Sequence, residues 1–429
     1  MKKSLIALAT LAATTAFAQS SVTISGQLDA GIAATKNGDG TAVTNMASGI
    51  HGASRLRFVG VEDVGGGTKA NFWLEMQPDF TNGTTNSAGL FNRGAWLGLS
   101  NASLGEIRLG RQGTNTIGTI CTIDQHGCYS GFYGGGILFS GQGAPGSQGA
   151  ALFAANVTRG GVSQNTGLLA PYATTSAATG AATAINDPIK NVQGASTGSL
   201  NQTNPDLFSV DSTRYVRAVR YSLPLLVNGL SVNATYAFAG SLPNGKLSGS
   251  NTTGADATYA NGPLTLVGSY QNTSADLVGF ASGQLTTVGG VYDFAVAKVG
   301  LGYQTEGATA GSLNTGTAAL LFTKAEATGV TVTVPMGAAT PYFKYAERKY
   351  SGGTLGNVTG AKIANIGVRY AMSKRSFLYV DYVDNGSSAG AGTNTKAKLD
   401  GVAAANTNGI TGFTGSLKTQ TSIGINHSF

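Results

Sequence analysis

The sequence has few charged residues and no long apolar run, and these two absences exclude most classes of protein. Asp, Glu, Lys and Arg make up 11% of the 429 residues, against about 25% in an ordinary soluble domain. No apolar stretch beyond residue 18 reaches the roughly 20 residues that a membrane-spanning helix needs. A large soluble globule and a helical membrane protein are therefore both disfavoured. Glycine is abundant instead, with 64 residues, and such a neutral mixture is expected where residues alternate between lipid and water in a β-barrel.

Histidine and cysteine are scarce as well. Acid–base and triad chemistry usually recruit histidine, and none of His51, His126 and His427 has an evident Ser/Asp partner in the sequence. Two cysteines with one intervening histidine lack the fourth ligand of a zinc site. We therefore predict no enzymatic activity, no cofactor and no metal. The basic residues are scattered singly, which disfavours a nucleic-acid partner.

Residues 1–18 are predicted to be a secretory signal peptide. Lys2 and Lys3 form a charged start, residues 5–11 form a short apolar core, and residues 16–18 read Ala-Phe-Ala, which is a typical cleavage site. Cleavage leaves residues 19–429 as one barrel domain in a compartment that permits disulfides. Cys121 and Cys128 are the only cysteines and have one possible intramolecular pairing, so we predict a disulfide between them.

The chain ends on an aromatic residue. Ile423, Ile425, His427 and Phe429 alternate with small polar residues and glycine, and a period of two predicts a β-strand with one apolar face. A terminal ring has little to pack on in a soluble protein, whereas in a membrane barrel it joins the interfacial aromatic girdle. The ending resembles the C-terminal assembly signal of bacterial outer-membrane barrels, with Phe429 as its last residue. An ordinary edge strand is the alternative.

Sixteen alternating segments follow one another along the mature chain. They are residues 22–34, 54–62, 69–77, 91–99, 106–111, 213–223, 230–238, 254–260, 264–271, 286–294, 297–305, 328–335, 340–348, 361–371, 376–383 and 418–429. Short turns alternate with longer polar links, of which residues 35–53 are the first. This pattern predicts an all-β fold: a 16-stranded antiparallel transmembrane β-barrel with short periplasmic turns and long extracellular loops.

The third polar link, residues 114–212, is much longer than the others. Sixteen strands enclose a lumen too wide for side chains to fill. We therefore predict that this third loop folds inward and narrows the lumen, at least over residues 114–142. No helix and no second domain are expected.

The alternation also places basic residues in the lumen. If Leu56 and Phe58 face outward, then Arg55 and Arg57 face inward. A charge on the lipid face costs about 2–4 kcal/mol at the bilayer midplane, which gives this assignment its energetic reason. The same parity turns Arg108 and Arg220 inward, but it turns Arg217 outward without an evident cause. Carboxylates of inward parity are Asp29, Glu75, Asp293 and Asp381. We predict a polar, net basic lumen, although each arginine has structural pairing with a carboxylate as its alternative role.

Several stretches together resemble the general porins of the β-proteobacterial branch. They read SSVTISGQLDAGIA from residue 20, SRLRFVGVEDVGGGTKANFWLE from residue 54, FNRGAWLGLS from residue 91, LGEIRLGRQ from residue 104 and GINHSF at the end. The resemblance implies a trimer of sixteen-stranded barrels, each narrowed by its third loop at a constriction where basic wall residues face acidic loop residues. The matching basic positions are Arg55, Arg93 and Arg111, with Arg57, Arg108 and Arg220 nearby. The long loop departs from the pattern because Asp124 is its one acidic residue before Asp187.

The leading hypothesis for function is an outer-membrane porin of a Gram-negative bacterium. It would be a passive diffusion channel for small hydrophilic solutes and ions with a weak preference for anions, set by a transverse field at the constriction. The alternatives are a substrate-selective anion channel for phosphate or dicarboxylates, and a surface adhesin or receptor anchored by the barrel. The expected partners are two further copies of the chain in a homotrimer, outer-membrane lipids, lipopolysaccharide, the barrel-assembly machinery, and small solutes and anions.

Overall fold

A computed structural model describes the strands of the barrel and the start of the long loop. The described residues are 20–37, 42–85, 90–124, 156–159, 162–165, 173–175, 182–184, 214–238, 240–241, 247–248, 251–274, 281–310, 324–351, 358–384 and 417–429. The predicted signal peptide, residues 1–18, lies outside them. Within these ranges, no helix is both long and apolar enough to cross a membrane.

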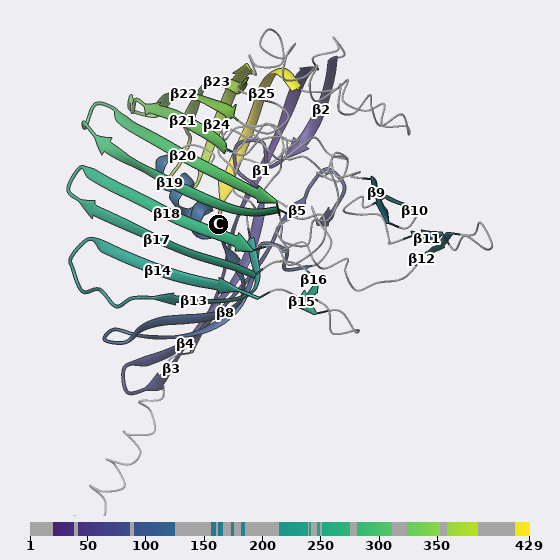
Figure 1. Ribbon diagram of the computed structural model, residues 1–429. Coiled ribbons are helices and arrows are strands. Elements are labelled where there is room, and N and C mark those ends of the chain that lie inside the picture. The colour runs from purple at the N-terminus through teal and green to yellow at the C-terminus, as the bar shows by residue number, and fades with distance from the viewer. Residues whose placement is uncertain are drawn as a thin grey trace, which may run out of the picture.

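The wall is a closed ring of antiparallel strands, as the alternation predicted. In ring order the strands are β1 (Ser21–Asn37), β3 (Arg55–Gly65), β4 (Thr68–Met76), β7 (Gly94–Asn101), β8 (Gly105–Gly113), β13 (Arg214–Ser222), β14 (Leu230–Ala237), β17 (Asn251–Asn261), β18 (Leu264–Ser274), β19 (Ala281–Asp293), β20 (Lys298–Ala310), β21 (Lys324–Thr333), β22 (Ala339–Ser351), β23 (Val358–Ala371), β24 (Ser376–Asp384) and β25 (Leu417–Ser428). Each overlaps one of the sixteen predicted segments. The ring closes where β25 pairs with β1, from Gln27 opposite Ser428 onward, and Figure 1 shows the two strands side by side.

The two faces of the wall differ as a membrane barrel requires. On one face, large apolar side chains such as Val22, Leu97 and Leu301 are exposed. On the other face, polar side chains such as Thr287 and Gln304 are buried and hydrogen-bonded to each other. The apolar face is the one that lipid or a neighbouring subunit covers.

An additional strand, β2 (Ala42–Ser48), precedes β3. It pairs with the C-terminal half of β1, while β3 pairs with the N-terminal half, so β2 and β3 share one position in the wall. The residues between them turn inward, and Ile50, Ala53 and Ser54 are buried. The expected polar link over residues 35–53 is therefore wrong for most of its length, because its short alternating pieces pair with β1 and its end packs inside the barrel.

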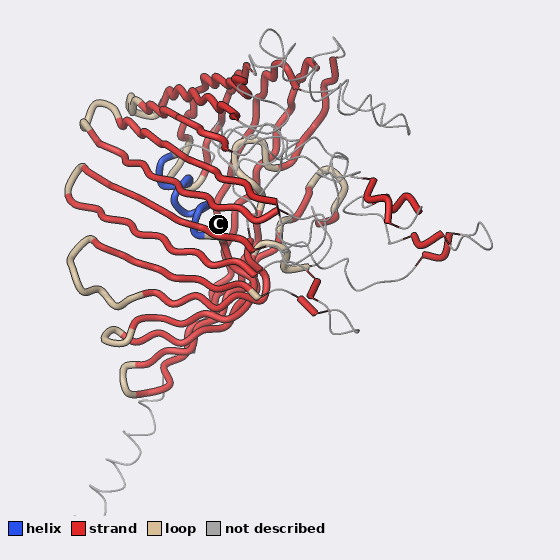
Figure 2. Tube along the Cα trace, viewed as in Figure 1, coloured by secondary structure: helices blue, strands red, loops and turns tan. Residues whose placement is uncertain are grey.

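The long third loop begins with a helix, α2 (Asn115–Ile123), although the sequence predicted no helix there. Thr114 caps it, with its hydroxyl accepting the Ile117 backbone N–H, as is usual for a threonine before a first turn. Figure 2 shows the helix inside the ring of strands, where it contacts β17, β18, β19 and β20. The predicted inward fold of this loop is thus confirmed for residues 114–124, and residues 125–142 lie outside the described part.

The remaining strands of the described residues form short hairpins that are not part of the wall. They pair β5 (Pro78–Asp79) with β6 (Thr84–Thr85), β9 (Asn156–Arg159) with β10 (Val162–Asn165), β11 (Ala173–Thr175) with β12 (Ala182–Ala184), and β15 (Gly240–Ser241) with β16 (Leu247–Ser248).

Arg217 points outward, as the strand parity predicts, and it lies at a β-bulge. The pairing of β13 with β8 shifts register between Tyr215 and Ala218, and Arg217 has a φ of 51°. An extra residue in one strand disrupts alternation and re-aims the side chains around it. Arg217 is exposed, and its Nε donates to the carbonyl oxygen of Phe238 at 3.3 Å.

Candidate functional site

Glu75 on β4 gathers arginines on the inner face of the wall. Its Oε2 accepts the Nε of Arg57 at 2.7 Å, and its Oε1 accepts the Nε of Arg93 at 2.7 Å. Arg55 also interacts electrostatically with this carboxylate. Arg93 precedes the first residue of β7, so strand alternation does not govern it, and it also donates to the side chain of Gln77. One buried carboxylate is therefore shared by several cations.

Two further arginines lie beside this group. Arg111 on β8 donates through Nε to the backbone carbonyl of Asn92 at 2.6 Å, and Arg214 on β13 donates to that of Arg93. Arg111 is within electrostatic reach of both Arg93 and Arg214. Like charges are thus held together by backbone carbonyls.

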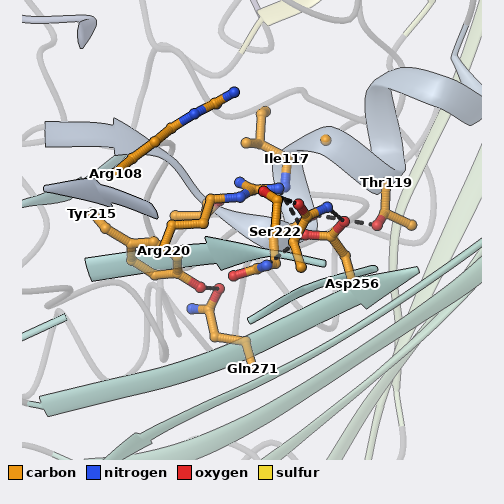
Figure 3. Close-up of polar contacts among 12 residues, drawn as sticks. Arg108, Ile117, Thr119, Tyr215, Arg220, Ser222, Asp256 and Gln271 are labelled. Carbon is orange, nitrogen blue, oxygen red and sulfur yellow. Dashed lines mark hydrogen bonds and ion pairs between the residues drawn. The ribbon is translucent and has the colours of Figure 1, made fainter. Parts of the chain in front are cut away.

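The lumenal arginines continue to Arg220 on β13, which pairs with Asp256 on β17. Asp256 accepts from Arg220 at 3.1 Å through Oδ1 and from Asn233 at 2.7 Å through Oδ2. Asn115, the first residue of α2, donates to the same Oδ1. Figure 3 shows Arg220 and Asp256 converging beside the helix, with Arg108 lying apart. The contact between Asn115 and Asp256 shows that the arginines and α2 lie on the same side of the wall, which is the lumenal side.

We call seven side chains the basic wall. They are Arg55, Arg57, Arg93, Arg108, Arg111, Arg214 and Arg220. Glu75, Glu106 and Asp256 form ion pairs with them in the part of the chain that the structure describes.

The helix packs on the wall through isoleucines. Ile117, Ile120 and Ile123 follow at spacings of three and are all buried, because that spacing places them on nearly one face of a helix. Gly289 on β19 and Gly300 on β20 make room for Ile123: a Cβ on Gly289 would collide with the Ile123 side chain, and one on Gly300 would come 2.5 Å from its carbonyl oxygen. The end of α2 therefore packs directly against the backbone of β19 and β20.

The end of the helix is fixed by a buried ion pair. Nζ of Lys344 on β22 lies 2.8 Å from Oδ1 of Asp124, and their side chains are 1% and 0% exposed. Thr331 on β21 donates to the carbonyl of Ile123 at 3.0 Å. Asp124 therefore pairs with a lysine on the wall next to α2. It anchors the helix, which differs from the acidic face opposite the arginines that the resemblance implies.

A second inward segment, residues 49–54, docks on β1 and β24. Oδ1 of buried Asp29 accepts the backbone N–H of His51 at 3.2 Å and the hydroxyl of Tyr379 at 3.0 Å. The His51 ring lies 3.8 Å from Asp381 and packs against the rings of Phe377 and Tyr379. The start of the third loop and this end of the first loop thus both line the lumen wall.

The structure brings most of the predicted site residues together. The basic residues predicted from the sequence all belong to the basic wall, whereas Asp124 lies elsewhere. Sequence reasoning missed Asp256, whose only signal is inward parity on a weakly alternating strand. Cys121 lies on α2, and Cys128 lies outside the described residues, so the disulfide stays a prediction.

The C-terminal residue closes the barrel. The backbone N–H of Phe429 donates to Gly26 at 3.1 Å, and Gly26 donates back at 3.0 Å. A Cβ on Gly26 would meet the Phe429 ring, so the ring covers β1 on the outer face. Its role as an assembly signal stays a prediction.

The chain is similar to known outer-membrane proteins. Among curated proteins, outer membrane porin protein 32 of Delftia acidovorans is 48% identical over 115 residues, covering 26% of this chain and 32% of that protein. Major outer membrane protein P.IB of Neisseria meningitidis serogroup B is 38% identical over 116 residues, covering 26% and 34%. The matched region thus spans about a third of the length of these relatives.

Solved structures match over nearly the whole chain. The anion-selective porin from Comamonas acidovorans superposes with a TM-score of 0.60 at 20% identity, covering 96% of this chain and 100% of that one. OmpF of Salmonella typhi superposes with a TM-score of 0.56 at 15% identity, covering 95% and 97%. At these identities the superpositions show a shared fold. The profile of a family described as Gram-negative porin matches residues 4–390, and the chain therefore belongs to this family of outer-membrane barrels.

Proposed function

We propose that the barrel is a passive diffusion channel for small hydrophilic solutes and ions, with a weak preference for anions. The observation that carries the proposal is the basic wall. Seven arginines from β3 to β13 gather on the lumenal face, where they outnumber the three carboxylates that pair with them among the described residues. No step of bond chemistry is required of any side chain.

The preference should be weak because the field is short-ranged. Charges in water are screened over about 8–10 Å at physiological salt, and many of these arginines are neutralised in part by ion pairs. The solved porin of Comamonas acidovorans is described as anion-selective, and the arginines of this chain give separate grounds for the same direction.

The test is the reversal potential of single channels in a KCl gradient across a planar bilayer. The wild type should prefer chloride, and the double variant Arg55→Gln with Arg93→Gln should lose much of that preference. Arg217→Gln is the matched control, because this arginine is outside the lumenal set. A cation-selective wild type, or a double variant as anion-selective as the control, would contradict the proposal. A barrel that passes no current would instead favour an adhesin or receptor.

A substrate-selective channel is the second candidate, favoured by the close group of Arg93, Arg111 and Arg214. Three neighbouring guanidinium groups suit multivalent anions such as phosphate or dicarboxylates. Current carried by such an anion would then saturate with concentration, whereas a general pore gives a linear rise.

We further propose a heat-resistant homotrimer in the outer membrane, in contact with lipid and lipopolysaccharide and assembled through the Phe429 end by the barrel-assembly machinery. Among the described residues, the large exposed apolar side chains from residue 22 to residue 109 are aliphatic apart from the thioether of Met46, whereas exposed tyrosines and phenylalanines begin at Tyr221. Aromatic residues favour the lipid interface, so the aliphatic arc around β1 and β7 suits a protein neighbour. A monomer mass by light scattering in detergent would defeat the trimer.

A further inference from the structure

The two tryptophans of the chain face the lumen. Trp73 on β4 and Trp96 on β7 are directly opposite in the strand register, and no other tryptophan occurs in the sequence. Their rings are nearly parallel, 8° apart, with centroids 6.3 Å from each other. Alternation along β4 puts Trp73 on the face of Glu75, which is the lumenal face. In membrane barrels, tryptophan is expected in the girdles that meet the lipid interface, so this placement calls for another explanation.

An arginine lies over each indole. The Cζ atom of Arg57 is 5.4 Å from the Trp73 centroid, and that of Arg108 is 4.4 Å from the Trp96 centroid. Because β3, β4, β7 and β8 are consecutive in the wall, the planar groups form one row: Arg57, Trp73, Trp96, Arg108. We call it the aromatic row. It crosses three strand spacings, about 14 Å.

The row stays accessible although its arginines have partners. The side chains of Arg57 and Arg108 are 26% and 32% exposed, even with Glu75 and Glu106 bound to them. Both tryptophans are half-buried and neither is covered completely. A solute in the lumen therefore meets indole surface between two cationic ends.

Two glycines on β7 leave room for the side chains of the aromatic row. The lumenal positions of β7 next to Trp96 are Gly94 and Gly98. A Cβ on Gly94 would come 2.7 Å from Cδ1 of Trp73, and one on Gly98 would come 3.2 Å from Cγ of Arg108. The indole and the arginine stem thus lie against bare backbone, which larger residues at these two positions would prevent.

We propose that the aromatic row is a binding site for planar aromatic carboxylates, the simplest being benzoate. This inference rests on the proposed channel function and names a solute class for it. An aromatic ring gains by stacking on indole, and a carboxylate gains from a guanidinium that donates two parallel N–H bonds. An aliphatic carboxylate gains only the second of these contributions, and a neutral aromatic gains only the first.

The test compares benzoate with cyclohexanecarboxylate, which has the same charge and a similar size but no aromatic face. Each acid is titrated into a bilayer chamber while the chloride current through single wild-type channels is recorded. Benzoate should reduce the current at concentrations about 2- to 10-fold lower than cyclohexanecarboxylate, the range that one aromatic contact supports. In Trp96→Leu the two acids should act at nearly equal concentrations. Phe343→Leu, which removes an exposed aromatic from the outer face of β22, should keep the wild-type ratio.

Equal block by the two acids in the wild type would overturn the inference, and so would an unchanged ratio in Trp96→Leu. Neither result would affect the channel function, which fails only if the wild type passes no current. Tryptophan fluorescence gives a readout that needs no variant, because both indoles of the protein belong to the row. Quenching of detergent-solubilised trimers by 4-nitrobenzoate should saturate. A strictly linear dependence on concentration would indicate collisions alone and would count against a site.

Discussion

Replacing Lys344 with methionine should loosen the end of α2 without unfolding the barrel. The lysine is buried on β22 and its ammonium lies 2.8 Å from the Asp124 carboxylate. Methionine keeps most of the side-chain volume and removes the charge. The variant therefore removes the ammonium that pairs with the buried Asp124 carboxylate.

The size of the effect follows from burial. Removing one partner of a buried ion pair costs about 3–5 kcal/mol, which is roughly a 150- to 4000-fold change in the local equilibrium, since about 1.4 kcal/mol is tenfold. Ile117, Ile120 and Ile123 are all buried, and each contributes roughly 1.5–3 kcal/mol. The isoleucines thus hold most of the helix on the wall, and only its last turn, next to β22, should detach.

The assay is single-channel current at constant voltage. Lys344→Met should show added current fluctuations, because the released end of the loop moves within the lumen. Adding Asp124→Leu should return the noise toward the wild-type level, since replacing both members of a buried pair by apolar residues is often neutral or stabilising. Lys298→Met is the control: its pair with Asp293 has a similar N–O distance of 2.9 Å, but the two side chains are 42% and 37% exposed. Quiet Lys344→Met channels, or noise that the double variant does not reduce, would refute the reasoning.

Two further predictions concern the same loop. Cys121 and Cys128 should be joined by a disulfide in the exported protein, so intact-mass measurement after alkylation without reductant should find no alkyl group, and two added groups would exclude the bond. Gly289→Val should displace the Ile123 side chain at a cost of about 1–3 kcal/mol, typical of overpacking, and should change the mean conductance. Gly307→Val, at a position where a Cβ meets nothing within 4 Å, should leave the conductance unchanged.

The strands could be predicted from the sequence because each one alternates between lipid and lumen. On β20, for example, Leu301 and Tyr303 are exposed while Gln304 is buried. A period of two is a strong signal when one face of the strand meets lipid and the other face meets water. The prediction fails where that alternation stops. Arg93 precedes the first residue of β7, so its side chain does not follow the parity of that strand, whereas Arg217 keeps the outward parity although the register shifts beside it.

The helix could not be predicted because its sequence disfavours it locally. Residues 115–123 contain three threonines and three isoleucines, and β-branched residues lose rotamer freedom in helices. What stabilises α2 is the wall: Asp256 at its start, Gly289 and Gly300 beneath Ile123, and Lys344 at its end. These partners lie more than a hundred residues away in the sequence, and no local pattern points to them.

The pairing of Asp124 with Lys344 also determines which charges contribute to the electric field in the pore. The resemblance implies a constriction with arginines on one side and loop carboxylates on the other, and Asp124 is the loop carboxylate available for that role. In the structure, its charge is matched by Lys344 and both side chains are withdrawn from the lumen. The double variant Lys344→Met with Asp124→Leu removes one charge of each sign, so its reversal potential in a KCl gradient should equal that of the wild type. A shift toward stronger anion preference would show instead that Asp124 acts on passing ions. In that case the selectivity would belong to the loop as much as to the basic wall.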